Sequence, residues 1–238
     1  MRDRKIKVVV PVSDSKWNKA LEELLESEAL PGTMIEVTSL ENGPKSIESE
    51  FDEAYSEHYV VDEVVKAERE GFNAVVVYCF GNPGLYAARE AVDIPVIGIG
   101  EASQLLAMSL GRKFSILSPV PQAVKRHWDK AKVIGSIGKL ASIRCINIPV
   151  LDLDRDIEVL KESILEKAEE AIKEDDADVV VLGCGSMMGI AQEISRELGI
   201  PVIEPGLAGF KFAEILCEMN LSHSKKAFMK PDFGKIVR

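Results

Sequence analysis

Two segments of this chain repeat the same arrangement, and the repeat strongly limits the folds that the chain can adopt. Cys79 closes the apolar run 74–78, and Cys184 closes the apolar run 179–183. Each cysteine precedes a glycine-containing turn and a helical pattern, and each is followed, 16 or 17 residues on, by the proline of an Ile-Pro pair (Pro95 and Pro201). Both segments are typical of a buried parallel strand, a tight turn, a helix and a second strand. The chain therefore contains a duplicated βαβ unit with a thiol at the end of each first strand.

Strand and helix patterns alternate along the whole chain, which predicts a doubly wound α/β fold. We expect strands at residues 6–11, 34–38, 74–78, 96–98, 114–117, 143–146, 179–182 and 202–203. We expect helices near residues 15–25, 49–71, 84–91, 102–110, 121–132, 157–175, 188–198 and 208–219. The two cysteine units are about 105 residues apart, a separation that favours an internal duplication over one continuous sheet.

The duplication predicts two pseudo-symmetric α/β lobes with parallel sheets and a cleft between them. We place the first lobe, with Cys79, at residues 1–100 plus 206–238, because the last helix is expected to cross back to it. The second lobe, with Cys184, is placed at residues 101–205.

Composition excludes several classes of protein. The net charge of −10 argues against a nucleic-acid-binding protein, which usually has a basic face. No apolar run approaches the ~20 residues that a membrane helix needs, and no signal-peptide pattern is present. The four cysteines lack metal-type spacing, and no phosphate-binding glycine motif occurs. We therefore expect a cytoplasmic homo-oligomer that acts on a small molecule without metal or cofactor and binds neither nucleic acid nor membrane.

The position of the two thiols predicts their chemistry. Ligands of open α/β sheets bind beyond the carboxyl ends of the strands, where Cys79 and Cys184 both lie. A helix beginning just after each cysteine is expected to lower the pKa of its thiol from about 8.5. Cys145 and Cys217 lie in apolar surroundings without a glycine turn, so we expect them to pack as small hydrophobic residues.

Residues near the strand ends are candidates for substrate binding. They are Pro11, Ser13, Phe80, Gly81, Asn82, Ser118, Gly185 and Ser186. The backbone N–H groups beside the glycines could hold a polarised carbonyl oxygen. Three of the candidates have an alternative structural role: Ser118 and Asn82 could instead cap helices, and Ser13 could do either.

Two further residue types have weaker claims to a role in the site. Glu204 ends a strand and is expected to be a cap or an acid that bridges the lobes. The three histidines, His58, His127 and His223, are expected at the surface, because none is spaced to pair with a cysteine.

The chain resembles the Asp/Glu/hydantoin racemase superfamily, and within it the hydantoin/allantoin racemase branch, over most of residues 5–219. The resemblance rests on Cys-Phe-Gly-Asn-Pro-Gly-Leu at 79–85, Gly-Pro-Lys-Ser-Ile-Glu-Ser at 43–49 and Leu-Gly-Cys-Gly-Ser-Met at 182–187. It implies racemisation by two cysteines without a cofactor, and the catalytic pair carries over to Cys79 and Cys184. The chain departs from the family at Asn82, where Asp is common, and at 10–15, where an Asn-Pro-Asn-Ser/Thr loop is common.

The reaction expected from this resemblance is racemisation of a 5-substituted hydantoin or of allantoin. One alternative is an aspartate or glutamate racemase, or a related carbon-acid enzyme. Such amino-acid substrates need clamps for two carboxylates, and no strand-end Arg or Lys is evident. An alternative of another class is a non-catalytic two-lobed protein that binds a small molecule.

Overall fold

The computed structural model describes residues 3–235, which form two parallel four-stranded sheets. The first sheet contains, in spatial order, β2 (Thr33–Ser39), β1 (Arg4–Val10), β3 (Ala74–Val77) and β4 (Val96–Gly98). The second contains β6 (Leu140–Cys145), β5 (Phe114–Ser118), β7 (Val179–Leu182) and β8 (Val202–Ile203). The strand order repeats from one sheet to the other, which confirms the predicted α/β fold with two pseudo-symmetric lobes.

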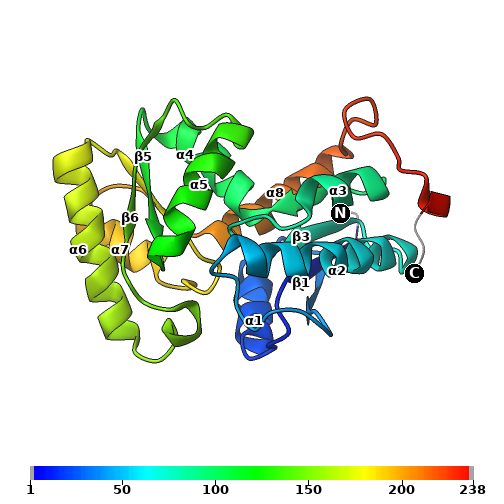
Figure 1. Cartoon of the computed structure of the whole chain (residues 1–238), viewed down its shortest axis with the longest axis horizontal. Coiled ribbons are helices and arrows are strands. Elements are labelled where there is room, and N and C mark those ends of the chain that lie inside the picture. The colour runs from blue at the N-terminus through cyan, green and yellow to red at the C-terminus, as the bar shows by residue number, and fades with distance from the viewer. Residues whose placement is uncertain (1–2, 236–238) are drawn as a thin grey trace.

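Helices cover both sheets, as Figure 1 shows. We call β1–β4 the first lobe, together with α1 (Asn18–Glu28), α2 (Glu50–Arg69), α3 (Leu85–Ala91) and α8 (Pro205–Met219). We call β5–β8 the second lobe, together with α4 (Ile99–Leu110), α5 (Pro121–Ile134), α6 (Ile157–Asp175) and α7 (Ala191–Leu198). Two short 3₁₀ helices, η1 (Val150–Asp152) and η2 (Phe233–Lys235), complete the described elements.

The central strands are buried on both faces, which explains their continuous apolar sequences. Val75 and Val77 of β3 pack into a core with α2 and α3. Ala74 and Val76 point the other way, into a core that includes residues of α1 and α8. Strand β7 alternates in the same manner between a core with α6 and α7 and a core with α4 and α5.

Helix α8 runs back from the second lobe to the first. It packs against β1, β3 and β4 and also lies along α4, so it contacts both halves of the molecule (Figure 1). The predicted boundaries of the lobes, at residues 100 and 205, stay a prediction. The ends of the predicted first lobe, residues 1–2 and 236–238, lie outside the described residues.

Element boundaries differ from the predictions where local contacts override the sequence pattern. Helix α2 begins after Ser49 as expected, because Ser49 and Asp52 form a reciprocal capping box. The helix predicted to begin at Met188 starts instead at Ala191, because Gly189 has φ +78° and its N–H donates to Glu204. Within residues 3–235 no helix combines the length and apolar character needed to cross a bilayer.

Candidate active site

The two strand-end cysteines open into one cavity between the lobes. Cys79 lies two residues beyond the end of β3, and Cys184 lies two residues beyond the end of β7. Both line a cavity of about 60 Å³, and neither forms a disulfide. The corresponding ends of two repeated strands therefore bring both thiols to a single site.

Apolar side chains from both lobes form most of this cavity. The first lobe and its loops contribute Val10, Pro11, Val12, Trp17, Leu21, Ile47, Tyr78 and Phe80. The second lobe contributes Pro119, Val150, Gly183, Gly185, Ser186 and Met188. A volume of about 60 Å³ is far below the ~300–1,000 Å³ of typical ligand pockets, so the lobes enclose the thiols tightly.

Tyr78 fixes the position of the two cysteine loops relative to each other. Its buried hydroxyl donates a hydrogen bond of 3.1 Å to the carbonyl oxygen of Gly185. A Cβ atom at Gly185 would lie 2.7 Å from the Tyr78 ring, and one at Gly206 would lie 2.2 Å from its hydroxyl. Both glycines are therefore required by the close approach of this one side chain.

Burial raises the pKa of both thiols. The pKa of Cys79 rises to about 12, chiefly through burial and then through the nearby Glu53 carboxylate. Burial also raises the pKa of Cys184, although the N–H and hydroxyl of Ser186 act in the opposite direction. The predicted lowering of both pKa values is therefore wrong for this enclosed site. The helices α3 and α7 begin only at Leu85 and Ala191, too far along the chain to act directly on the sulfur atoms.

A buried charge cluster lies on the outer side of the Cys79 loop. Glu53 of α2 pairs with Arg126 of α5 at 3.3 Å and also with Lys130 of α5, so the cluster joins the two lobes. Arg126 lowers the pKa values of both Cys79 and Cys184, against the larger effect of burial. The three charged residues also line a groove of about 520 Å³ between α2, α3 and α5.

The predicted substrate-binding residues divide into two groups. Pro11, Phe80, Gly185 and Ser186 line the cavity with the thiols. The other four, Ser13, Gly81, Asn82 and Ser118, are not among the described residues that line it.

Three of these four residues use their side chains in hydrogen bonds to the backbone. Ser13 donates to the carbonyl oxygen of Gly43 at 3.0 Å. Asn82 accepts a 3.0 Å hydrogen bond from the N–H of Gly100 and does not cap α3. The hydroxyl of Ser118 donates to the carbonyl oxygen of Val120 at 2.9 Å.

Glu204 is placed between two loops of the second lobe. One carboxylate oxygen accepts a 2.8 Å hydrogen bond from the N–H of Gly189, and the other is buried without a hydrogen-bond partner among residues 3–235. Burial raises the pKa of Glu204 to about 7. The residue precedes α8, but its side chain does not cap that helix.

The prediction of three surface histidines holds for His58 alone. His223 is partly buried, and its Nε2 accepts a 2.9 Å hydrogen bond from the N–H of Val96. His127 is 2% exposed, and its ring packs edge-on against Phe80, with ring centroids 4.9 Å apart. Burial lowers the pKa of His127 to about 3, which keeps the ring neutral. His127 lies on the same inward face of α5 as Ala123 and Ala131, a periodicity that identifies its burial.

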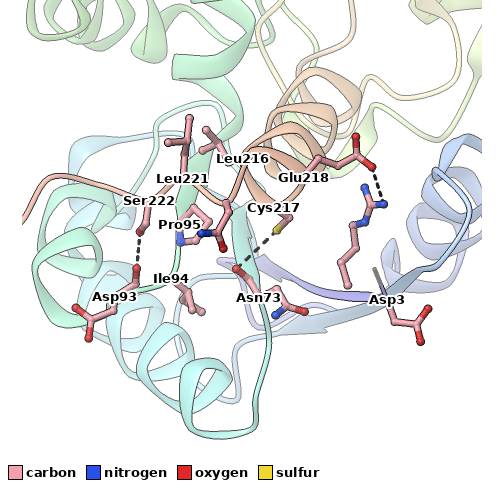
Figure 2. A pocket seen from close by; sticks show the side chains of 12 residues that line it. Asp3, Asn73, Asp93, Ile94, Pro95, Leu216, Cys217, Glu218, Leu221 and Ser222 are labelled. Atoms are coloured by element: carbon pink, nitrogen blue, oxygen red, sulfur yellow. Dashed lines mark hydrogen bonds and ion pairs between the residues drawn. The ribbon is translucent and has the colours of Figure 1, made fainter. Parts of the chain in front are cut away.

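The other two cysteines lie outside the cavity. Cys145, at the end of β6, contacts the Asn147 side chain at 3.2 Å. Cys217 contacts the carbonyl oxygen of Asn73 at 3.7 Å in a separate cavity of about 650 Å³, drawn in Figure 2. That cavity lies beside the residues preceding β3 and β4, at the end of the first sheet opposite Cys79.

Several residues of the site were not identified from the sequence. Tyr78 follows three valines of a buried strand, and its position could have indicated a role, because a buried tyrosine hydroxyl usually needs a hydrogen-bond partner. Glu53 lies on the inward face of α2 with Ser56 and Val60, a periodicity that marks a buried acid. Trp17, whose indole N–H is buried without a partner in the described part of the chain, gave no comparable signal.

Comparison with known proteins agrees with this geometry. A sequence model of the family "Asp/Glu/Hydantoin racemase" matches residues 6–213. The chain is 38% identical to a hydantoin racemase of Pseudomonas sp. (strain NS671), over 98% of this chain and 94% of the relative. It is 36% identical to a hydantoin racemase of Paenarthrobacter aurescens, over 95% and 97% of the two chains.

A solved structure extends the comparison to three dimensions. An allantoin racemase from Klebsiella pneumoniae superimposes with a TM-score of 0.94 and 32% identity, covering 99% of this chain and 97% of that one. The match therefore includes both lobes and both cysteine loops. The chain belongs to the Asp/Glu/hydantoin racemase family and is a racemase.

Proposed function

We propose that this racemase interconverts the enantiomers of 5-substituted hydantoins or of allantoin by proton transfer between Cys79 and Cys184. The observation that carries the proposal is the shared cavity, which both thiols enter from equivalent strand ends of opposite lobes. Identities of 38% and 36% to two hydantoin racemases support this substrate class.

The chemistry of the ring suits two thiols. The hydrogen at C5 of a hydantoin lies between a carbonyl and a ring nitrogen, and its removal gives an enolate conjugated with that carbonyl. One cysteine takes the proton as a thiolate, and the other donates a proton to the opposite face as a thiol. Phe80, Gly185 and Ser186 line the cavity beside the thiols, and we expect a backbone N–H group of these loops to stabilise the enolate oxygen.

The lining of the cavity favours a neutral ring over a dicarboxylate. Among the described residues that line it, none is Arg or Lys, the residues that usually clamp carboxylates. Trp17, Ile47, Val150 and Met188 instead provide an apolar wall. This wall suits an apolar group at C5, because burial of apolar surface is favourable.

Proton exchange with solvent tests the proposal. Each candidate (5-substituted hydantoins, allantoin, aspartate and glutamate) is incubated in D₂O with the enzyme, and loss of the C–H signal is followed by proton NMR. Spontaneous exchange, measured without enzyme, is subtracted. We expect enzyme-dependent exchange for hydantoins or allantoin. Exchange confined to aspartate or glutamate would contradict the proposed substrate class.

A further inference from the structure

The two thiols of the cavity have unequal surroundings, and the difference comes from α2. Glu53 and Cys79 approach the same glycine: the point where a Cβ atom at Gly81 would stand lies 2.8 Å from Glu53 Oε2 and 3.8 Å from Cys79 Sγ. The Glu53 side chain is 6% exposed, so little water lies between the carboxylate and the thiol loop. An anion at this place disfavours a second negative charge on Cys79.

The charged and titratable groups around each thiol can be named. Cys79 faces Glu53 of α2, Arg126 of α5 and Cys184 across the cavity. Cys184 faces Ser186, Glu48 before α2, Arg126 and the buried hydroxyl of Tyr78. Arg126 favours a thiolate at both positions, and at Cys79 it opposes the effect of Glu53.

Ser186 lowers the pKa of Cys184, whereas Glu53 raises the pKa of Cys79. The backbone N–H and the hydroxyl of Ser186, two residues on, both lower the pKa of Cys184, because both stabilise a thiolate. The Cys79 sulfur receives one such contribution, from the backbone N–H of Gly81. Burial opposes a thiolate at both sulfurs, and Glu48 adds to this at Cys184, but the Cys184 loop offsets it with two contributions and the Cys79 loop with one.

We propose that the Glu53 carboxylate keeps the proton of the pair on Cys79, so that Cys184 is the base of the resting enzyme and Cys79 is the acid. The proposal rests on the two-thiol mechanism given above, in which Glu53 is a positioning residue that acts through Cys79. In the resting state the Cys184 thiolate takes the C5 proton, and the Cys79 thiol gives its proton to the opposite face. The pair then carries its proton on Cys184 and its negative charge on Cys79, beside Glu53.

That product state is the less stable one. Proton exchange with solvent returns the pair to the resting state, and the same exchange precedes reaction of the opposite enantiomer. Lys130 and Arg126 limit the effect of Glu53 by pairing with its carboxylate oxygens. Lys130 is the more accessible partner, with a side chain that is 29% exposed.

Thiol alkylation tests the order of reactivity directly. The full chain is treated with iodoacetamide at pH 6 to 10, and the initial rate at each cysteine is measured by peptide mass spectrometry. We expect Cys184 to react before Cys79 in the wild type. In Glu53→Gln the ratio of the two rates should fall about tenfold, the change in thiolate population that one pKa unit produces.

Matched variants separate the charge effect from other causes. Glu57→Gln makes the same charge change one turn further along α2 at an exposed site, and it should leave the ratio unchanged. Lys130→Gln removes a counter-charge from Glu53, and it should raise the ratio severalfold. If circular dichroism shows that Glu53→Gln does not fold, the rate ratio in Lys130→Gln tests the role of Glu53 by itself.

Three results would overturn the proposal: faster alkylation of Cys79 in the wild type, an unchanged ratio in Glu53→Gln, or an unchanged ratio in Lys130→Gln. The pH at which each alkylation rate is half its maximum distinguishes a change in ionisation from a change in accessibility, because a purely structural change does not move this midpoint.

Racemase assays of Cys79→Ser and Cys184→Ser are run in parallel. If both variants are inactive but the ratio of alkylation rates does not change in Glu53→Gln, the two-thiol mechanism stands and only the role of Glu53 is lost. If either serine variant retains turnover, the mechanism itself fails, whatever the alkylation order.

Discussion

The hydroxyl of Tyr78 donates a hydrogen bond of 3.1 Å to the carbonyl oxygen of Gly185, which joins the residue before one cysteine to the residue after the other. The contact crosses from the first lobe to the second and is fully buried. The spacing of the two thiols is therefore set by a direct bond between their loops, in addition to the packing of the lobes.

Replacement of either strand-end cysteine by serine should abolish racemisation. A serine hydroxyl is far too weak an acid to replace a thiol near neutral pH, so we expect turnover to fall by more than about 10²-fold in Cys79→Ser and in Cys184→Ser. Optical rotation measures activity, and circular dichroism reports whether the fold is retained. Near wild-type turnover in either folded variant would show that two thiols are not needed.

Cys145→Ala and Cys217→Ala are the matched controls for these variants. Both thiols are partly exposed, and both lie outside the cavity. We expect activity within a factor of about two of wild type and a loss of unfolding free energy of roughly 1 kcal/mol. A more than tenfold loss of activity in a folded variant would mean that the wrong pair had been chosen.

Tyr78→Phe should lower stability and weaken catalysis without blocking it. The substitution leaves the buried Gly185 carbonyl without its partner, at a cost of about 1–3 kcal/mol. Urea denaturation measures the free energy of unfolding. Tyr55→Phe, at an exposed tyrosine of α2, is the control and should change stability by less than about 0.5 kcal/mol. Equal stability of the two variants would show that the bond to Gly185 contributes nothing.

Glu204 should make the stability of the protein depend on pH. Its pKa is raised to about 7 in the folded protein from the ordinary value of 4.5. The folded state therefore binds the proton more tightly than the unfolded state. The resulting stabilisation is complete below pH 4.5 and is lost as the pH rises to about 7.

The variant Glu204→Gln carries no charge at any pH and tests this sign. Its free energy of unfolding, measured by urea denaturation at each pH, should match that of the wild type near pH 4 and exceed it increasingly up to pH 8, by on the order of 3 kcal/mol at most. Glu197→Gln, at an exposed site on α7, makes the same charge change without burial. A Glu204→Gln advantage that does not vary with pH would rule out titration of this carboxyl group.

The place of the two thiols at strand ends could be predicted because its signal is local. Each cysteine ends an apolar run and precedes glycines, and parallel strands place such residues at one edge of a sheet. The direction of their pKa shifts could not be predicted, because burial depends on how closely the two lobes pack. The same applies to the pairing of Glu53 with Arg126, which lie on different lobes.

The fold could be predicted for a similar reason, since strand and helix periods are properties of neighbouring residues. The start of α7 could not, because the bond between Gly189 and Glu204 closes a loop that the local pattern does not encode. Ser118 illustrates the same limit: its position at a strand end suggested a ligand contact, but its hydroxyl bonds to Val120 two residues on.

The path of α8 has a consequence for biosynthesis. This helix covers β1, β3 and β4, yet it is translated after all eight strands. While the ribosome makes the hundred or so residues between β4 and α8, the face of the nascent N-terminal sheet that includes Val76 is covered by α1 but not yet by α8. We expect a chain released before Pro205 to expose part of this apolar face, and so to be bound by chaperones or cut by proteases.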